Sequence, residues 1–367
     1  MCRLGFDWGQ DLQIGMQRFL LFATTLYALP ILRPLAQSIR ASGGEVGWFV
    51  ATPLLAYMKS GERLLRDIAG VNAFAPGVVF SASNWVPYFF PGLKVQVFHG
   101  FNVEKRAPER GHFRIRGLFD LYCTQGPATT EPFQALAARH RHFAVVETGW
   151  PKLDPLFSTN GHDTRDLRPA DGRRVCMYAP TFTDGLSSAR SLYDEIARQI
   201  AAGDRYWLLT LHPKCEPDIV ARYRALGGPN ARFLEATDLV DMMRAADILV
   251  SDTSSVVSEF VVQEKPVVTF RNRAPKPHMI NFSRCDQLEA ALRIAESPGA
   301  QYRNEVRAWA EQIHPYRDGR SSERVLAATA EFEARWARQL APKPRNFLRN
   351  LKGRLRYHRW VEQAVSE

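Results

Sequence analysis

Short apolar runs alternate with amphipathic segments along the chain from residue 18 onward. The run from Arg18 to Ala23 predicts a buried strand, and the apolar spacing from Leu29 to Ile39 predicts a helix that ends at Gly43-Gly44. A second apolar run, from Val46 to Val50, predicts another strand. A strand, a helix and a strand in this order predict a βαβ unit with parallel strands.

The same segment has an alternative interpretation as a membrane span from Phe19 to Leu35. Pro30, Arg33 and Pro34 interrupt this span, and it is shorter than the ~20 apolar residues that a spanning helix needs. No small-residue cleavage site of a signal peptide is found there. The pattern therefore favours the βαβ unit over a membrane anchor.

The alternation continues over most of the chain, with one break. It predicts helices over 54–68 and 128–139, and strands at 77–81, 94–98, 118–123 and 143–147. The polar stretch 158–174 lacks periodicity and predicts a linker. Beyond it, strands are predicted at 175–178, 206–211, 232–235, 248–250 and 266–270, and helices over 192–201, 219–226, 239–246 and 256–261. The sequence thus predicts an α/β protein with two doubly wound Rossmann-like domains that face a cleft, residues 1–160 and 172–330.

Three groups of polar residues directly follow predicted strands. They are His99-Gly100, His212-Pro213-Lys214 and the run from Ser251 to Ser255. Open parallel sheets bind ligands at the carboxyl ends of their strands. A histidine there can take the proton of an attacking hydroxyl, and a glycine after it lets a substrate approach closely. The structural alternative for each histidine is a hydrogen-bonded residue at the end of a strand.

The run from Ser251 to Ser255 also precedes a predicted helix. One hydroxyl is enough to cap that helix, whereas the three hydroxyls of Thr253, Ser254 and Ser255 together with Asp252 favour an anion site where backbone N–H groups contact a phosphate. An ordinary helix cap is the alternative. No group of His, Asp or Glu residues has the spacing of metal ligands, so no protein metal site is predicted. Asp252 could at best share a Mg²⁺ ion with a diphosphate.

The charge of the chain bears on its partners. The 367 residues include 48 Lys or Arg and 38 Asp or Glu, which gives a formal net charge of +10, and 46% of the residues are hydrophobic. This content is enough for about two domains, and the charge favours a nucleotide, a phosphopolymer, an anionic membrane or nucleic acid as partner. The five cysteines have no paired spacing and are expected to be reduced thiols of a cytosolic protein.

A basic tail follows a helix predicted over 331–340. Residues 342–360 contain seven Lys or Arg and no acid, and Phe347, Leu351 and Leu355 recur at helical spacing. This pattern predicts a basic amphipathic helix that suits an anionic membrane surface. The alternatives are a solvated tail, a tail packed on the body of the protein, and a nucleic-acid contact. Nucleic acid is not expected, because the tail is not an aromatic-rich platform.

Six motifs occur in a fixed order between residues 90 and 325. They are QVFHG at 96–100, TGWPKLD at 148–154, YAPTF at 178–182, LHPK at 211–214, ADILVSDTSS at 246–255 and YRDGRSSER at 316–324. This series resembles the CDP-glycerol glycerophosphotransferase family, which includes teichoic acid glycerophosphate polymerases and primases. The resemblance implies a glycosyltransferase-B type fold, with residues 1–160 on the acceptor side and residues 172–330 binding the nucleotide donor.

The resemblance also implies an activity and the residues that carry it. Glycerol phosphate from CDP-glycerol, or a related CDP-alditol, would be transferred to a hydroxyl of a lipid-linked or polymeric acceptor, with release of CMP. His99 would be the base, and His212 would contact the donor phosphates. The implied substrate-binding residues are Gly100, Tyr178, Pro180, Thr181, Lys214, Asp252, Thr253, Ser254, Ser255, Glu259 and Arg271. The chain departs from the usual family pattern at Phe98, Thr253 and Glu259.

Two competing hypotheses use the same fold. One is a nucleotide-sugar glycosyltransferase, and the other is an inert subunit that binds a polymer at a membrane surface. The leading hypothesis predicts a cytoplasmic enzyme of surface-polymer synthesis, such as a capsule or a teichoic-acid-like polymer. It would be peripheral at the inner face of the cell membrane and bound there through the tail at 331–367.

Overall fold

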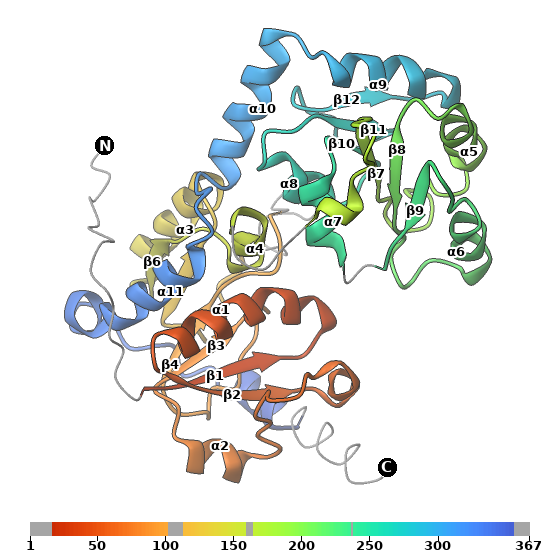
Figure 1. The fold of residues 1–367 in the computed structure, drawn as a ribbon. Coiled ribbons are helices and arrows are strands. Elements are labelled where there is room, and N and C mark those ends of the chain that lie inside the picture. Colours follow the sequence, from red (N-terminus) through yellow and green to blue (C-terminus); the bar gives the residue numbers. More distant parts are fainter. Residues whose placement is uncertain (1–16, 102–112, 159–163, 236–237, 356–367) are drawn as a thin grey trace. The chain divides into compact units, whose positions relative to one another are not determined.

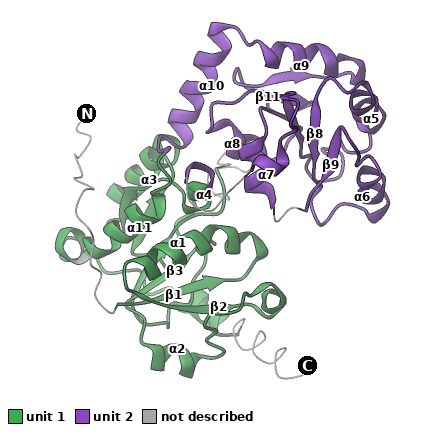
Figure 2. Cartoon of the chain, in the orientation of Figure 1, with its two compact units in different colours: residues 1–154, 318–367 green, residues 155–317 purple. Residues whose placement is uncertain are grey.

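The computed structural model of the chain describes residues 17–101, 113–158, 164–235 and 238–355. The chain divides into two compact units, residues 1–154 with 318–367 and residues 155–317 (Figure 2). Each unit is built on one parallel sheet of six strands whose strands are connected by helices (Figure 1). The predicted α/β class with two Rossmann-like sheets is confirmed.

The sheet of the first unit has the strand order β2-β1-β3-β4-β5-β6. Its strands are β1 Arg18–Ala23, β2 Glu45–Val50, β3 Val78–Ser81, β4 Leu93–Gln96, β5 Leu121–Thr124 and β6 Ala144–Glu147. Its helices are α1 Leu29–Ala41, α2 Ile68–Phe74, α3 Pro127–His140 and α11 Ser321–Ala330, and the short α4 Asp154–Phe157 begins at the unit's boundary. The strand order reverses between β1 and β3. Such a reversal marks the place where open α/β sheets bind ligands.

An aromatic core supports the segment that follows β4. Phe98 is fully buried, and its ring contacts Phe133 of α3 edge-on with the ring centroids 5.0 Å apart. The ring centroid of Tyr122 in β5 lies 5.0 Å from that of Phe133 and 4.7 Å from that of Phe143. Aromatic pairs at such distances contribute stabilisation beyond the area that they bury. The backbone just before His99 is therefore anchored in the core.

The single helix predicted over residues 54–68 is wrong. Thr52–Tyr57 forms a 3-10 helix, and α2 begins only at Ile68. Between these helices, the N–H of Leu65 donates to the carbonyl of Trp48, and the N–H of Trp48 donates to the carbonyl of Arg63, both at 2.8 Å. These bonds draw the segment into extended pairing beside β2, so a contact outside the segment overrides its local helical pattern.

The sheet of the second unit has the strand order β12-β11-β10-β7-β8-β9. Its strands are β7 Val175–Tyr178, β8 Tyr206–Leu209, β9 Ala231–Phe233, β10 Ile248–Ser251, β11 Val267–Phe270 and β12 Ile280–Phe282. Its helices are α5 Tyr193–Ala202, α6 Pro217–Arg224, α7 Leu239–Ala245, α8 Val256–Val261, α9 Leu288–Glu296 and α10 Ala300–Ile313. The order reverses between β7 and β10. The predicted functional residues after these two strands therefore flank the switch point of the sheet.

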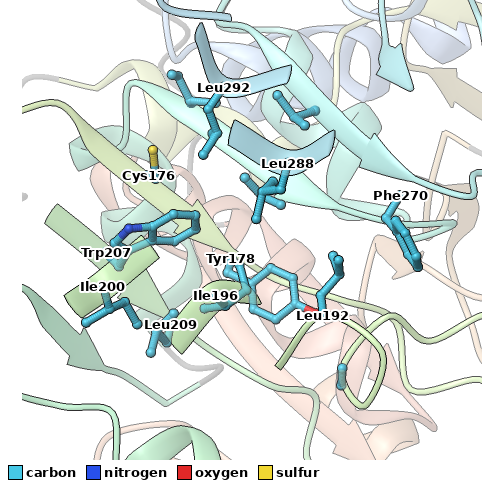
Figure 3. Packing of buried hydrophobic residues seen from close by; sticks show 14 of the residues in the cluster. Cys176, Tyr178, Leu192, Ile196, Ile200, Trp207, Leu209, Phe270, Leu288 and Leu292 are labelled. Carbon is cyan, nitrogen blue, oxygen red and sulfur yellow. The ribbon is translucent and has the colours of Figure 1, made fainter. Parts of the chain in front are cut away.

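Helices α5 and α9 cover one face of this second sheet. Trp207 of β8 packs in a cluster with Ile196 of α5 and Leu288 and Leu292 of α9, and all four side chains are buried (Figure 3). The strand residues Cys176 and Tyr178 belong to the same cluster. Strands buried in this way read as continuous apolar runs, which is why the sequence pattern located β7, β8 and β10 well.

Helix α11 belongs to the first unit. The carboxylate of Asp154 accepts hydrogen bonds from the backbone N–H groups of Ser321 and Ser322, each at 2.7 Å. Residues 318–330, which the sequence analysis grouped with the second domain, thus contact the first unit. A π-helical turn at Glu333–Ala337 follows, where a helix over 331–340 was predicted, and residues 347–355 are helical. We call residues 341–355 the C-terminal strap.

No helix of the described residues is both long enough and apolar enough to cross a membrane. Cys123, Cys176, Cys215 and Cys285 are free thiols. Burial raises the pKa of the Cys123 and Cys176 thiols, which keeps both protonated.

Candidate functional site

Asp252 lies directly after β10, and its side chain is completely buried. Its Oδ1 accepts the backbone N–H of Thr181 at 2.9 Å, and its Oδ2 accepts both the backbone N–H and the hydroxyl of Ser188 at 2.8 Å. Burial raises the pKa of the Asp252 carboxyl, and the hydrogen bonds from Ser188 and Thr181 oppose that shift. The carboxylate therefore holds the loop between β7 and α5 in place across the switch point.

The same network extends into the core through Tyr178. Since the single proton of the Ser188 hydroxyl goes to Asp252, the Tyr178 hydroxyl must be the donor in its 2.9 Å hydrogen bond with Ser188. The Tyr178 ring is buried and stacks on Tyr223 with the centroids 5.4 Å apart. Figure 3 shows Tyr178 among the core side chains. Tyr178 thus holds the loop from the core through its hydrogen bond to Ser188, and its ring is not exposed at the surface.

The residues after Asp252 are held by a second loop, which follows β11. Asn272 donates its side-chain N–H to the carbonyl of Asp252 at 2.8 Å, and the N–H of Arg273 donates to the Thr253 hydroxyl at 3.0 Å. Ser254 is half-buried and Ser255 is exposed. No side-chain hydrogen bond caps α8 at its N-cap Ser255. The hydroxyl of Ser254, however, accepts the N–H of Val256 at the start of α8 at 3.4 Å, so one hydroxyl of the run does contact the helix start.

Three other predicted residues of the second unit have different surroundings. Pro180 and Glu259 are buried, the first just past β7 and the second within α8. Arg271 has a left-handed backbone (φ 45°), donates its Nε–H to the carbonyl of Ser283 at 2.8 Å, and stacks on Phe270. The Arg271 side chain thus contacts the residue that follows β12.

His212 follows β8, and its ring has a defined tautomer when neutral. Its Nδ1 lies 3.1 Å from the backbone N of Lys214. Because a backbone N–H can only donate, Nδ1 is the acceptor and the neutral ring carries its proton on Nε2. Desolvation by surrounding atoms lowers the pKa of His212, and the positive charge of Lys214 adds to the shift. Near neutral pH, His212 therefore presents an Nε2–H donor.

Phe182 stacks on this histidine. The ring centroids are 4.1 Å apart at an interplanar angle of 29°, and the Nζ of Lys214 lies 5.4 Å from the centroid of Phe182. Phe182 is 39% exposed, so this stack lies at the surface of the carboxyl edge. Phe182 comes from the loop that Asp252 holds through Thr181. The position of the His212 ring therefore depends on the same loop.

His99 has the opposite tautomer. Its Nδ1 lies 3.2 Å from the carbonyl oxygen of Ala82, the residue after β3. Because a carbonyl can only accept, Nδ1 carries the proton, and in the neutral ring Nε2 keeps its lone pair. Tyr27 stacks on the ring with the centroids 5.3 Å apart. His99 thus presents a proton acceptor, whereas His212 presents a donor.

The backbone that leads into His99 is strained. Phe98 has a φ of +58°, a left-handed conformation that costs a non-glycine residue roughly 1 kcal/mol or more. The indole N–H of Trp150 donates to the Phe98 carbonyl at 3.4 Å. At Gly100, an added Cβ would meet no atom within 4 Å. The described residues therefore leave space beside Gly100, as the close approach of a substrate requires.

The predicted site residues lie in both units, in two separate groups. Thr181, Asp252, Thr253 and Ser254 share the switch point of the second sheet, and His99 and Gly100 follow β4 in the first. Sequence reasoning missed Ser188, Asn272 and the stacking partners Phe182 and Tyr27. Ser188 lies in the polar segment TDGLSSARS, where no pattern distinguishes it from its neighbours. Only the hydrogen bonds to Asp252 reveal its role.

Asp252 is the residue of this site that the sequence analysis considered as a metal ligand. In the described part of the chain, no group of three or more His, Cys, Asp or Glu residues could hold a metal ion. Both carboxylate oxygens of Asp252 already accept hydrogen bonds from Thr181 and Ser188, so this donor set does not suit a cation. A Mg²⁺ ion that arrives with a donor diphosphate stays a prediction.

Comparison with known proteins supports the family resemblance. Residues 111–275 match the family model described as CDP-Glycerol:Poly(glycerophosphate) glycerophosphotransferase. The matched segment is similar to the CDP-glycerol glycerophosphotransferase family. It runs from before β5 of the first unit to beyond β11 of the second, and it contains four of the six motifs, from TGWPKLD to ADILVSDTSS.

Curated relatives of this family are similar at low identity. The teichoic acid glycerol-phosphate primase of Bacillus subtilis (strain 168) is 24% identical over 195 residues, which cover 50% of this chain and 50% of the relative. The teichoic acid ribitol-phosphate polymerase TarL of Staphylococcus aureus (strain NCTC 8325 / PS 47) is 25% identical over 272 residues, or 63% of this chain and 46% of the relative. The chain thus spans about half the length of the curated relatives that it matches.

Solved structures show the same fold. The wall teichoic acid polymerase TagF has a TM-score of 0.62 at 15% identity, over 88% of this chain and 90% of that chain. A putative UDP-N-acetylglucosamine 2-epimerase from Listeria monocytogenes has the same TM-score and identity, over 89% and 99%. Both likenesses support the glycosyltransferase-B type fold of two Rossmann-like units.

Proposed function

We propose that the protein transfers glycerol phosphate, or a related alditol phosphate, from a CDP-alditol to a hydroxyl of a polymeric or lipid-linked acceptor. The curated relatives are named as both glycerol-phosphate and ribitol-phosphate enzymes, so the proposal names the class of donor. The observation that carries it is the pair of opposite tautomers: the neutral His99 has its proton on Nδ1 and accepts at Nε2, and the neutral His212 donates from Nε2–H. Phosphoryl transfer to a hydroxyl needs one proton acceptor and donors for the phosphate oxygens.

The proposed reaction assigns each group one task. The acceptor oxygen forms a bond to the alditol-bearing phosphorus, and the bond from that phosphorus to the anhydride oxygen breaks, so that CMP leaves. The hydroxyl proton passes to Nε2 of His99, while Nδ1–H stays bonded to Ala82. His212 donates Nε2–H to a phosphate oxygen, and Lys214 supplies positive charge. Thr253, Ser254 and Ser255 line the diphosphate site, where Asp252 positions the loop without contacting the donor.

A direct assay tests this proposal. Purified protein is incubated with CDP-glycerol, CDP-ribitol or UDP-N-acetylglucosamine and a glycerol phosphate oligomer, and the released nucleotide is measured. CMP release that depends on the acceptor supports the proposal. Release from the UDP-sugar alone would favour the glycosyltransferase alternative. Donor binding without any turnover, unchanged in His99→Ala, would favour the inert binding subunit.

We further propose that the C-terminal strap holds the protein at an anionic membrane surface, at the inner face of the cell membrane. Its helix at 347–355 exposes four apolar side chains, namely Phe347 (74%), Leu348 (79%), Leu351 (57%) and Leu355 (57%). Lys352 and Arg354 on the same helix are also exposed. Exposed apolar residues beside cations suit the headgroup region of an anionic bilayer. Co-sedimentation with phosphatidylglycerol vesicles but not with phosphatidylcholine vesicles, lost in Leu351→Asp, is the expected result.

A further inference from the structure

The C-terminal strap forms one wall of a cavity of about 370 Å³ on the first unit. The cavity is lined by Asn84, Trp85, Arg116, Arg349, Lys352 and Gly353. Three of these six residues are cations, and they come from two segments far apart in the sequence. The strap thus brings Arg349 and Lys352 to the same cavity as Arg116.

Specific contacts hold the strap in this position. The Nζ of Lys343 forms an ion pair with Asp120 at 2.7 Å, and Asn346 donates to the carbonyl of Arg116 at 3.1 Å. The guanidinium of Arg349 donates to the same carbonyl. An added Cβ at Gly117 would lie 2.4 Å from Pro344, so only glycine permits this approach. The cavity is therefore part of a packed interface within the first unit.

The three cations of the cavity have no acidic partner among the described residues. Among the described residues, no carboxylate lies within ion-pair distance of Arg116, Arg349 or Lys352, and the Asp120 carboxylate pairs with Lys343. The pKa of Arg116 is lowered by burial first and then by the positive charge of Arg114; Tyr122 opposes this shift, and Arg349 adds to it. Like charges gathered without a counter-ion repel each other, and a bound anion would offset that repulsion.

The cavity is connected to His99 through one turn. Asn84 accepts a hydrogen bond from Gln96, the last residue of β4, at 2.7 Å. The hydroxyl of Ser81 donates to the carbonyl of Trp85 at 3.0 Å, and Ala82 between them accepts the Nδ1–H of His99. The turn that fixes the tautomer of His99 is therefore the turn that lines the cavity.

We propose that this cavity binds a phosphate group of the acceptor chain, a specificity role that rests on the proposed function. The planar guanidinium groups of Arg116 and Arg349 can each offer two parallel N–H donors to phosphate oxygens, and Lys352 adds a point charge at the rim. A polyol phosphate acceptor carries such a group at every repeat. Binding one of them here would present a terminal hydroxyl to the base on the same unit.

The first experiment measures binding without any donor or turnover. A soluble glycerol phosphate oligomer is titrated into the full chain by isothermal calorimetry, with inorganic phosphate as a second probe. Lys352→Gln is the main variant, because no hydrogen bond of the strap depends on this side chain. An about ten-fold weaker affinity for the oligomer in Lys352→Gln is expected, with recovery in Lys352→Arg. Unchanged affinity in Lys352→Gln and in Arg116→Gln would overturn the proposal.

Arg354→Gln is the matched control. Arg354 lies on the same helix and is exposed, but its guanidinium lies over Tyr88 and Phe89 instead of lining the cavity. Wild-type affinity of Arg354→Gln for the oligomer is expected. A second arm uses phosphatidylglycerol vesicles, because a lipid headgroup carries the same phosphodiester. Equal losses of vesicle binding in both variants, with no loss of oligomer binding, would assign the cations to the membrane surface and overturn the proposal.

Kinetics separate this inference from the proposed function. With CDP-glycerol as donor, Lys352→Gln is expected to raise the acceptor KM about ten-fold and to leave the donor KM unchanged. If no donor supports turnover but the oligomer binds and Lys352→Gln weakens it, the phosphate site is supported and the proposed function fails. If turnover is found and the acceptor KM does not change, the proposed function is supported and the phosphate site is overturned.

Discussion

Asp252 and Ser188 lie 64 positions apart in the chain and are joined by two hydrogen bonds of 2.8 Å, one from the backbone N–H of Ser188 and one from its hydroxyl. Because Asp252 is fully buried, each of these donors would be left unsatisfied if its acceptor were removed. The pair links β10 to the loop after β7, where the strand order of the second sheet reverses. Its main consequence is that the acid of the Ser-Asp-Thr-Ser-Ser motif positions the loop.

Asp252→Asn is expected to lower the free energy of unfolding by about 2–4 kcal/mol, since the amide cannot accept from Thr181 and Ser188 on both sides. Ser188→Ala removes the hydroxyl bond to Asp252 and the acceptor of the Tyr178 hydroxyl, but keeps the backbone N–H bond, and is expected to cost about 1–3 kcal/mol. Urea unfolding of the full chain measures both values. The control is Asp286→Asn, whose carboxylate pairs with Arg284 at the surface and is expected to matter little. If Asp252→Asn lowers the free energy of unfolding no more than Asp286→Asn does, the proposed role of Asp252 in holding the loop after β7 is contradicted.

His99→Asn distinguishes the roles of the two ring nitrogens of His99. The asparagine amide can still donate to the carbonyl of Ala82, but it has no equivalent of the Nε2 lone pair. We expect kcat to fall by about 10²- to 10⁴-fold while donor affinity and the melting temperature stay near the wild-type values. Steady-state CMP release and calorimetric titration of the donor check this. A loss of donor affinity equal to the loss of kcat would argue against the role of His99 as a base.

Phe182→Ala is expected to change the titration of His212. The stack at 4.1 Å keeps water from one face of the imidazole, and desolvation is the largest cause of the lowered pKa. Without Phe182, the pKa of His212 should rise toward its ordinary value. NMR titration of the His212 ring protons measures this. Phe182→Tyr should keep the wild-type titration, and an unchanged pKa in Phe182→Ala would refute the stacking argument.

His278 gives the second unit a pH-dependent stability. The ring is buried, stacks on Trp309 at 4.7 Å, and has a pKa lowered from 6.5 to about 4 by burial first and Lys276 second. Above pH 6.5, both the folded and unfolded states leave it neutral. Below pH 6.5, the unfolded state binds a proton that the folded state does not bind until about pH 4. The free energy of unfolding should therefore fall as the pH is lowered from 6.5 to about 4, by up to about 3 kcal/mol.

His278→Phe should remove this dependence. The phenyl ring keeps the stack on Trp309, and the Nε2 atom that it replaces has no hydrogen-bond partner in the described structure. Unfolding measured at pH 7.5 and pH 4.5 should give a smaller difference for the variant than for the wild type. His140→Gln, which changes an exposed histidine of the first unit, is the control. Equal pH dependence in all three proteins would show that other groups dominate.

The alternating pattern predicted most strands and the chemistry at their ends. Strands such as Val175–Tyr178 and Ile248–Ser251 are buried on both faces, so their apolar runs are visible without any tertiary information. His99, His212 and Asp252 were singled out because they follow such runs. The parallel sheet then places the end of each strand at the same edge, which made the location of these residues predictable.

Tertiary structure decided what these residues do. The helix predicted over 54–68 was lost because Trp48 of β2 offers both of its backbone groups to Arg63 and Leu65. The tautomers of His99 and His212 depend on the carbonyl of Ala82 and the N–H of Lys214, and the carboxylate of Asp252 is bound by Ser188. The sequence determined which segments form strands, because burial on both faces leaves a continuous apolar run. Only the folded chain determined the partner of each polar group, because hydrogen bonds over long sequence separations leave no periodic trace.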